Sequence, residues 1–157
     1  MEAIVLIGIQ GSGKTTFCRQ FFGNHTPISL DIVKTRGRER GLLETCLRTG
    51  QKFAVDNTNP TAAERAVYIA AAKRAGFRVK GYFFEPSLHL SLKRNAQRSG
   101  RAVIPAVGVI ATLKRLQRPS FSEGFDELYI VSSENDEFVI TEFARGLPSL
   151  AAMEITT

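Results

Sequence analysis

One segment near the start of the chain, Gly8-Ile-Gln-Gly-Ser-Gly-Lys-Thr15, constrains the fold more than any other. It fits the pattern G-x-x-x-x-G-K-[ST] and follows a continuous apolar run, residues 3–7, which is typical of a strand buried on both faces. The residues after it, 15–22, have the composition of a helix that Gly23 would end. A strand, a glycine-rich loop and a helix in this order indicate a phosphate-binding P-loop.

The residues of this loop suit the binding of a nucleoside triphosphate. Glycines let the backbone turn its N–H groups toward a phosphate, and a helix N-terminus adds partial positive charge. Lys14 would reach the β- and γ-phosphates, and the hydroxyl of Thr15 would ligate Mg²⁺. We therefore expect ATP and Mg²⁺ as cofactors, with contacts to the nucleotide from Gly8, Gln10, Gly11, Ser12, Gly13, Lys14, Thr15 and Thr16.

Length and composition indicate an ordinary globular chain. Its 157 residues fit one domain, and 43% of them are hydrophobic and 23% charged. The apolar runs are far shorter than the ~20 residues that cross a bilayer, and residues 1–4 do not resemble a signal peptide. Cys18 and Cys46 lack the spacing of a metal site and are expected to be reduced thiols. These features favour a cytoplasmic protein without membrane contact.

Short apolar strands alternate with helical segments along the whole chain. Strands are expected at residues 3–7, 27–30, 53–55, 78–84 and 128–131, and residues 137–140 are a candidate edge strand. Helices are expected at residues 15–22, 41–48, 60–76 (with Pro60 in the first turn), 87–97 and 105–118. This alternation favours a single domain, residues 1–157, with a three-layer α/β P-loop fold and a mostly parallel five-stranded sheet.

Two acidic residues, Asp31 and Asp56, directly follow short apolar runs. The ligand of an open α/β sheet lies beyond the carboxyl ends of the strands, so both side chains are expected to face the phosphates. Phosphoryl transfer to an alcohol uses a base beside the hydroxyl and a metal ion on the phosphates. Asp31 would be that base and contact the acceptor, and Asp56 would hold Mg²⁺ or its water beside the substrate. The alternatives are an N-cap for Asp31 and a structural turn for Asp56.

Charge is distributed unevenly along the chain, whose formal net charge is +6. Residues 87–122 include seven Lys or Arg and no acid, whereas residues 123–142 include seven acids and no Lys or Arg. A second basic cluster consists of Lys34, Arg36, Arg38 and Arg40. These segments flank the expected phosphate site, so a polyanion is a natural partner. A multiply charged metabolite, or a solvated basic face, would account for the same pattern.

Three arginines in the acid-free segment are candidates for a lid over the phosphates, at about residues 94–104. Arg94 and Arg98 are four residues apart and would share a helix face, and Arg101 follows a glycine that would end the helix. We expect Arg98, with Arg94, to contact the nucleotide and act on the transferring phosphate, and Arg101 to lie on the substrate side. The alternative is that these charges only complement the helix dipole.

Several motifs together resemble the 5′-hydroxyl polynucleotide kinases of phage, bacterial and animal end-healing enzymes. The P-loop resembles theirs, and Asp31-Ile-Val-Lys34 resembles their D-x-x-R element. The segment 55–60 (Val-Asp-Asn-Thr-Asn-Pro), followed by Glu64-Arg65, is similar to their D-[NT]-T-N segment. Matches to their arginine lid and their E-G-F element fall at Lys93–Arg98, Ala102–Pro105 and Pro119–Phe125. The matches are collinear over residues 3–131.

This resemblance implies an adenylate-kinase-like enzyme that uses ATP and Mg²⁺ to phosphorylate the 5′-hydroxyl of a nucleic acid. It implies that Asp31 is the general base and that Lys34 stands where the family has an arginine on the acceptor's phosphate. No D-x-D-x-[TV] phosphatase signature is found, so a stand-alone kinase is expected. The alternatives are a sugar, nucleoside or toxin-type kinase of the same P-loop branch, or a nucleotide-dependent switch without transfer. RNA and DNA acceptors, and a monomer or a homodimer, are equally compatible with the sequence.

Overall fold

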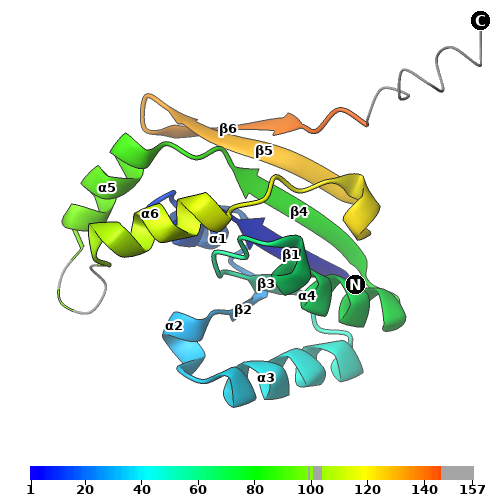
Figure 1. The fold of residues 1–157 in the computed structure, drawn as a ribbon. Helices are drawn as coiled ribbons and strands as arrows, with labels where there is room; N and C mark the ends of the chain where they lie inside the picture. Colours follow the sequence, from blue (N-terminus) through cyan, green and yellow to red (C-terminus); the bar gives the residue numbers. More distant parts are fainter. Residues whose placement is uncertain (99, 101–103, 146–157) are drawn as a thin grey trace, which may run out of the picture.

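The apolar run that opens the sequence becomes the central strand of a single sheet. In the computed structural model, which describes residues 1–98, 100 and 104–145, six strands follow the order β2-β3-β1-β4-β5-β6 (Figure 1). Their bounds are Glu2–Ile7 (β1), Thr26–Ile28 (β2), Phe53–Val55 (β3), Arg78–Phe84 (β4), Glu127–Glu134 (β5) and Glu137–Glu142 (β6). All neighbours pair in parallel except β5 and β6. The predicted mostly parallel sheet is confirmed, with the candidate edge strand added as a sixth strand.

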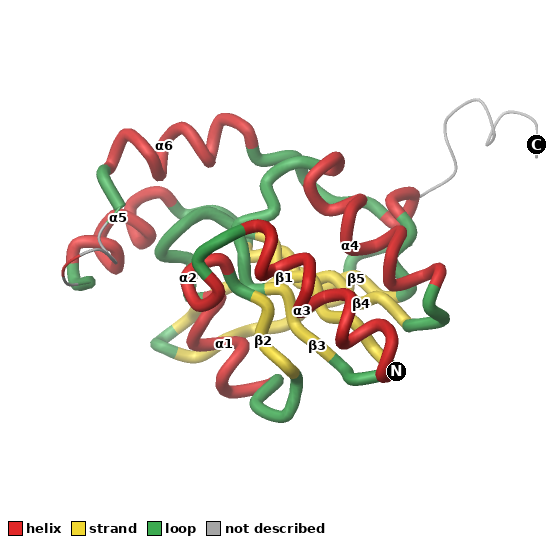
Figure 2. Tube along the Cα trace, turned by 90° about the horizontal axis from the view of Figure 1, so that it is seen from below, coloured by secondary structure: helices red, strands yellow, loops and turns green. Residues whose placement is uncertain are grey.

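Helices cover both faces of this sheet. They are α1 (Lys14–Phe21), α2 (Leu30–Val33), α3 (Arg36–Thr49), α4 (Ala62–Arg74), α5 (Leu88–Ala96) and α6 (Ala106–Arg115), and a 3₁₀ turn, η2, spans Phe121–Glu123. Figure 2 shows α3 lying across the strands, with the short α2 beside its first turn. Within the described residues, no helix is long and apolar enough to cross a membrane.

The central strand divides its side chains between two cores. Ala3, Val5 and Ile7 pack in one cluster with residues of α3 and α4, whereas Ile4 and Leu6 pack in the other with Phe17 of α1. All five strand residues are fully buried. The strand is therefore apolar throughout because both of its faces are covered, which is the cause of the continuous run in the sequence.

Two helix starts differ from the expectations. Helix α3 begins at Arg36 instead of residue 41, because the side chain of Thr35 accepts a hydrogen bond from the backbone N–H of Arg38 and caps the helix. Helix α4 begins at Ala62, so the expected place of Pro60 in its first turn is wrong. Thr61 caps α4 through the N–H of Glu64 in the same way. In both places a threonine N-cap, and not the glycine or proline on which the expectation rests, sets the start of the helix.

The carboxyl ends of β1, β3 and β4 lie at the same edge of the sheet, since these strands are parallel. The loop after β1 leads into α1, and the segment after β4 leads into α5 (Figure 1). The P-loop therefore lies at the same edge as Asp56 and the start of the segment that bears Arg94 and Arg98.

Candidate active site

Residues Gly8–Gly13 connect β1 to α1 and form the phosphate loop. Gly11 and Gly13 adopt φ values of +75° and +93°, which side chains rarely tolerate. A Cβ atom at Gly11 would lie 2.4 Å from the carbonyl oxygen of Ser91, so α5 packs directly on the loop. The loop conformation therefore requires glycine at both positions for the backbone angles, and at Gly11 also for the contact with α5.

Lys14, the first residue of α1, is hydrogen-bonded within the loop. Its Nζ atom donates hydrogen bonds to the carbonyl oxygen of Ile9 at 2.8 Å and to Oγ of Ser12 at 3.3 Å. Burial lowers the pKa of Lys14 to about 8; the carboxylates of Asp56 and Asp31 oppose this shift, and the charge of Arg98 adds to it. The ammonium group is thus poorly compensated, and a bound phosphate would supply the missing negative charge.

Replacing Lys14 with Met is expected to abolish nucleotide binding and to stabilise the folded chain. A pKa lowered from 10.5 to about 8 means that burying the charge costs about 3 kcal/mol at neutral pH. Losing the hydrogen bonds to Ile9 and Ser12 costs about 1–2 kcal/mol in return, so the free energy of unfolding should rise by about 1–2 kcal/mol. Urea unfolding at pH 7, with and without ATP, measures both effects. A variant less stable than the parent protein would contradict this expectation.

The pH dependence of stability provides an independent check on Lys14. Between pH 8 and pH 10.5 the unfolded lysine keeps its proton and the folded one has lost it. The unfolded state then binds more protons, so the contribution of Lys14 makes the parent protein more stable as the pH rises through this window. Lys14→Met should lack this contribution.

Thr15 and Asp56 form a pair of oxygen donors beside Lys14. The hydroxyl of Thr15 donates a hydrogen bond to Oδ2 of Asp56 at 2.7 Å, because Asp56 follows β3 and β3 pairs with β1. Carboxylate and hydroxyl oxygens suit Mg²⁺, and two protein donors leave the other positions of an octahedral ion to phosphate and water. Among the described residues, no cluster of three His, Cys, Asp or Glu offers another metal site. The pair therefore fits a Mg²⁺–nucleotide complex.

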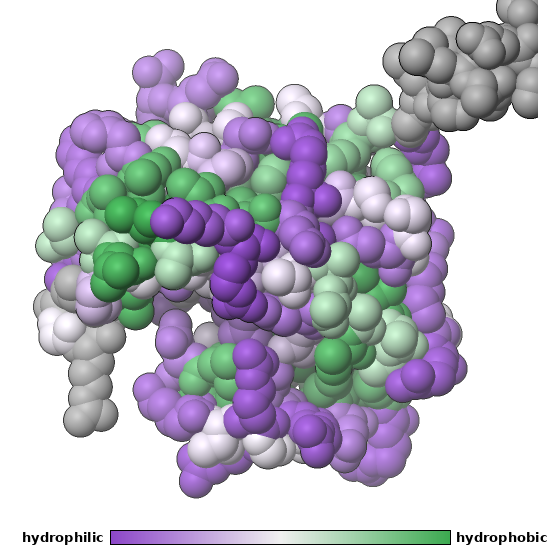
Figure 3. All heavy atoms as spheres, viewed as in Figure 1, coloured by the Kyte–Doolittle hydropathy of each residue, from purple (hydrophilic) through white to green (hydrophobic). Residues whose placement is uncertain are grey.

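A cleft of about 480 Å³ opens beside these residues. Figure 3 shows this face hollowed between the part formed by α5 and α6 and the part formed by α2 and α3, with hydrophilic residues along the opening. The P-loop, α2, α3, α4 and the loop after β3 all contribute to its lining. Lys14, Thr15, Asp31, Asp56 and Arg98 line it together.

Asp31 lies in this cleft but not at the end of a strand. Strand β2 ends at Ile28, and Asp31 is the second residue of α2. The N-cap of α2 is Ser29, so the alternative that Asp31 is an N-cap is wrong. Lys34 ends α2 in a left-handed conformation, with φ 73°. Lys34 is exposed and is not part of the cleft lining, so its contact with an acceptor stays a prediction.

The arginines of the expected lid occupy different places. Arg98 lines the cleft, whereas the NH1 atom of Arg94 lies 3.6 Å from the position that a Cβ atom at Gly13 would take. Helix α5 ends at Ala96, so the expectation that Arg94 and Arg98 share a helix face is wrong. Arg101 lies outside the described residues.

A polar network centred on the buried side chain of Glu39 lines one wall of the cleft, and it was not predicted from the sequence. The carboxylate of Glu39 accepts hydrogen bonds from the hydroxyl of Tyr68 (2.6 Å), Nδ2 of Asn57 (3.0 Å) and NH1 of Arg36 (3.1 Å). Burial and the neighbouring Glu39 raise the pKa of Tyr68 to about 12. A helix expected to start only at residue 41 leaves Glu39 outside it, so no candidate role is predicted for this residue. The cap at Thr35 was the signal that would have placed it on the helix.

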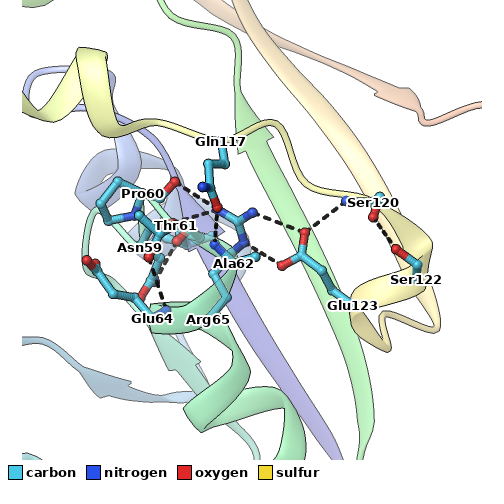
Figure 4. Close-up of polar contacts among 11 residues, drawn as sticks. Asn59, Pro60, Thr61, Ala62, Glu64, Arg65, Gln117, Ser120, Ser122 and Glu123 are labelled. Carbon is cyan, nitrogen blue, oxygen red and sulfur yellow. Dashed lines mark hydrogen bonds and ion pairs between the residues drawn. The ribbon is translucent and has the colours of Figure 1, made fainter.

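Arg65 is not part of the cleft lining, but it bonds to the loop after β3, which lines the cleft (Figure 4). Its side chain is fully buried, and its Nε and NH2 atoms donate to the two carboxylate oxygens of Glu123 at 2.8 and 3.0 Å. Its NH1 atom donates to the carbonyl oxygens of Asn59 and Pro60 at 2.9 and 3.2 Å. Two of the segments that resemble the polynucleotide kinases, Glu64-Arg65 and Pro119–Phe125, therefore contact each other.

The loop that Arg65 holds in place is in turn bonded to the P-loop strand. Nδ2 of Asn59 donates to the carbonyl oxygen of Leu6 at 2.8 Å, and the N–H of Gly8 donates to the carbonyl oxygen of Thr58 at 3.0 Å. These bonds fix the start of the P-loop against the loop that bears Asp56. Arg65 and Glu123 thus act on the shape of the site and not on the ligand.

Two curated proteins are similar to this chain in sequence. A protein of Acanthamoeba polyphaga mimivirus, described as a bifunctional polynucleotide phosphatase/kinase, is 29% identical in an alignment 151 residues long that covers 90% of this chain and 35% of that protein. The bifunctional polynucleotide phosphatase/kinase of Schizosaccharomyces pombe is 26% identical in an alignment 129 residues long that covers 79% of this chain and 32% of that protein. The chain spans about a third of the length of each relative. The predicted resemblance is confirmed.

Solved structures share the fold at lower identity. Kti12 of Chaetomium thermophilum, in complex with ADP-AlF3, has a TM-score of 0.65 and 16% identity, with 86% of this chain and 91% of that chain covered. A gluconokinase from Sinorhizobium meliloti 1021 has a TM-score of 0.58 and 18% identity, with 83% and 82% covered. These likenesses establish the three-layer P-loop architecture.

A family model described as AAA domain matches residues 4–119, a range that runs from β1 to the segment before η2 and includes the P-loop, Asp56 and the cleft. By this match and by its P-loop, the chain belongs to the AAA domain family.

Proposed function

We propose that this protein is a kinase that uses ATP and Mg²⁺ to phosphorylate the 5′-hydroxyl of an oligo- or polynucleotide. The observation that carries the proposal is the composition of the cleft, where Lys14 and Thr15 share one lining with the carboxylate of Asp31 and with Arg36 and Arg40. The similarity to two polynucleotide phosphatase/kinases supports this choice of acceptor.

The proposed reaction assigns one task to each charged group. The acceptor's hydroxyl oxygen forms a bond to the γ-phosphorus while the bond from that phosphorus to the β–γ bridging oxygen breaks and ADP leaves. The hydroxyl proton passes to the carboxylate of Asp31, which lines the cleft on the side of α2. Lys14 and Arg98 meet the negative charge of the phosphates. Mg²⁺, held by Thr15 and Asp56, would neutralise the phosphate oxygens.

A polyanionic acceptor suits the exposed basic face of α3. Arg36 and Arg40 are four residues apart, so they share one side of the helix, and both line the cleft. NH1 of Arg36 donates to Glu39 and Tyr68, which orients this guanidinium along the wall of the cleft. Arg38 belongs to the same helix and is also exposed, but it is not part of the lining.

Arg40→Ala is therefore expected to weaken the binding of a 5′-hydroxyl oligonucleotide, with Arg38→Ala as the matched control. If Arg40 contacts one phosphate of a single strand, its loss should lower the steepness of log K against log salt by about 0.7. Binding measured by fluorescence anisotropy at several salt concentrations gives this slope. Equal slopes for Arg38→Ala, Arg40→Ala and the parent protein would contradict the proposed contact of Arg40 with a phosphate of the acceptor.

One assay tests the proposed function directly. The protein is incubated with γ-labelled ATP, with or without Mg²⁺, and with 5′-hydroxyl DNA and RNA oligomers, their 5′-phosphorylated counterparts, nucleosides and a panel of sugars. We expect label on the 5′-hydroxyl oligomers alone, and only with Mg²⁺. Label on a sugar or nucleoside, with none on oligomers, would overturn the proposal in favour of a small-molecule kinase. The likeness of the fold to a gluconokinase is the reason for testing this alternative. Nucleotide binding without transfer to any acceptor would favour the alternative that the protein is a nucleotide-dependent switch.

A further inference from the structure

Helix α2, which bears Asp31, is not held in place by a buried side chain. All four of its residues are described, and none of them is buried; Ile32 is 63% exposed. The helix has a single turn, and the N-cap Ser29 makes no side-chain capping bond within the described chain. Apolar burial within α2 is therefore slight, although a general base must lie at a defined distance from the hydroxyl that it deprotonates.

A residue from another strand end caps this helix instead. The backbone N–H of Leu30, the first residue of α2, donates a hydrogen bond to Oδ1 of Asn57 at 3.0 Å. Asn57 lies 27 residues away in sequence, in the loop after β3, and it directly follows Asp56. It therefore takes the part that the side chain of the N-cap residue usually plays.

The orientation of this amide is fixed by its other bonds. Nδ2 of Asn57 donates to Oε2 of Glu39 at 3.0 Å and contacts the hydroxyl of Tyr68 at 3.3 Å. A carboxylate only accepts hydrogen bonds, so the NH₂ group must face Glu39 and the carbonyl oxygen must face Leu30. Glu39 is 5% exposed and accepts a hydrogen bond from Tyr68 at 2.6 Å. The cap of α2 is thus anchored in a buried network between α3 and α4.

We infer that Asn57 is a positioning residue, which sets the place of Asp31 relative to the phosphate site. Asp56 contacts Thr15 of the P-loop, and the next residue along the chain holds the helix that bears Asp31. One strand end therefore sets the metal side and the base side of the site together. The role of Asp31 in this inference rests on the proposed function, whereas the capping of α2 does not.

Asn57→Leu removes the cap with little change in side-chain size. We expect turnover to fall by about 10²-fold, because a small displacement of a reacting group is enough for such a loss, while the KM for ATP stays within about twofold. Introduced into Asp31→Asn, the same change should cause little further loss, since the base that it positions is already absent. Asn57→Asp keeps an acceptor for Leu30 but loses the donor to Glu39, so it should recover only part of the rate.

Hydrogen exchange followed by mass spectrometry provides a readout that does not depend on any acceptor. In Asn57→Leu the amides of residues 30–33 should exchange faster, and those of β1 should be unchanged. Phe77→Leu, a buried core change outside the cleft lining, is the control for a general loss of stability and should leave the turnover intact. Unchanged exchange of residues 30–33 in Asn57→Leu, or a rate loss that is fully additive with Asp31→Asn, would overturn the inference. A parent protein inactive on every oligonucleotide would count against the proposed function alone.

Discussion

Asp31→Asn is expected to slow phosphoryl transfer by about 10²–10⁴-fold while the affinity for ATP stays within a few-fold of the parent value. The amide keeps the shape of the carboxylate but cannot accept the proton of the attacking hydroxyl. Asp31 lies in α2 on the cleft wall, and within the described residues no hydrogen bond joins its side chain to the P-loop, so ATP binding should depend on it only weakly. Single-turnover kinetics with a labelled 5′-hydroxyl oligomer, together with calorimetric titration of ATP, separate the two quantities.

Asp136→Asn is the control for this measurement, because Asp136 is an exposed carboxylate in the turn between β5 and β6 and is not part of the cleft lining. It should behave like the parent protein. If Asp31→Asn lost ATP affinity in proportion to its rate, Asp31 would be a structural or metal-binding residue. If it transferred phosphate at the parent rate, the base would have to be another group.

Arg65→Met should lower the free energy of unfolding by about 3–5 kcal/mol, the cost of breaking a buried ion pair by removing one partner. Arg65 has no exposed surface and the side chain of Glu123 is 12% exposed, so the remaining carboxylate would be left without its counter-charge. The carbonyl oxygens of Asn59 and Pro60 would lose their donor as well. Equilibrium unfolding in urea measures the loss.

Two further variants separate this effect from a general response to mutation. Arg115→Met breaks the contact of Arg115 with Glu64, two side chains that are 57% and 38% exposed, and it should cost no more than about 1 kcal/mol. Combining Arg65→Met with Glu123→Leu should recover part of the lost stability, because no unpaired charge then remains buried. A double variant as unstable as the sum of its single changes would show that the pair itself is not the cause.

The parts of the fold that could be predicted from the sequence are those that a local pattern determines. The run at residues 3–7 is apolar because both faces of β1 are buried, and the spacing of Gly8, Lys14 and Thr15 specified a P-loop. The place of Asp56 at a strand end was also predictable, since it depends only on the parallel pairing of β1 and β3.

The parts that could not be predicted depend on contacts between distant segments. Helix α2 has one turn and no buried residue, and the side chain that accepts a hydrogen bond from its first N–H belongs to Asn57, 27 residues away. The role of Arg65 was equally hidden, because its partner Glu123 lies 58 residues further along the chain. No periodicity within either segment reports such a partner.

The pairing of Arg65 with Glu123 also affects the order in which the chain can assemble during synthesis. On the ribosome Arg65 emerges well before Glu123, so the guanidinium that braces the loop after β3 must wait for the start of η2 and β5 to be translated. That loop binds the N–H of Gly8 through the carbonyl oxygen of Thr58. A nascent chain that already includes the P-loop and α6, but not yet Glu123, therefore has the phosphate-binding motif without the contact between Arg65 and Glu123. We therefore expect the contact that braces the phosphate-binding motif to form late in translation, after the motif itself has left the ribosome.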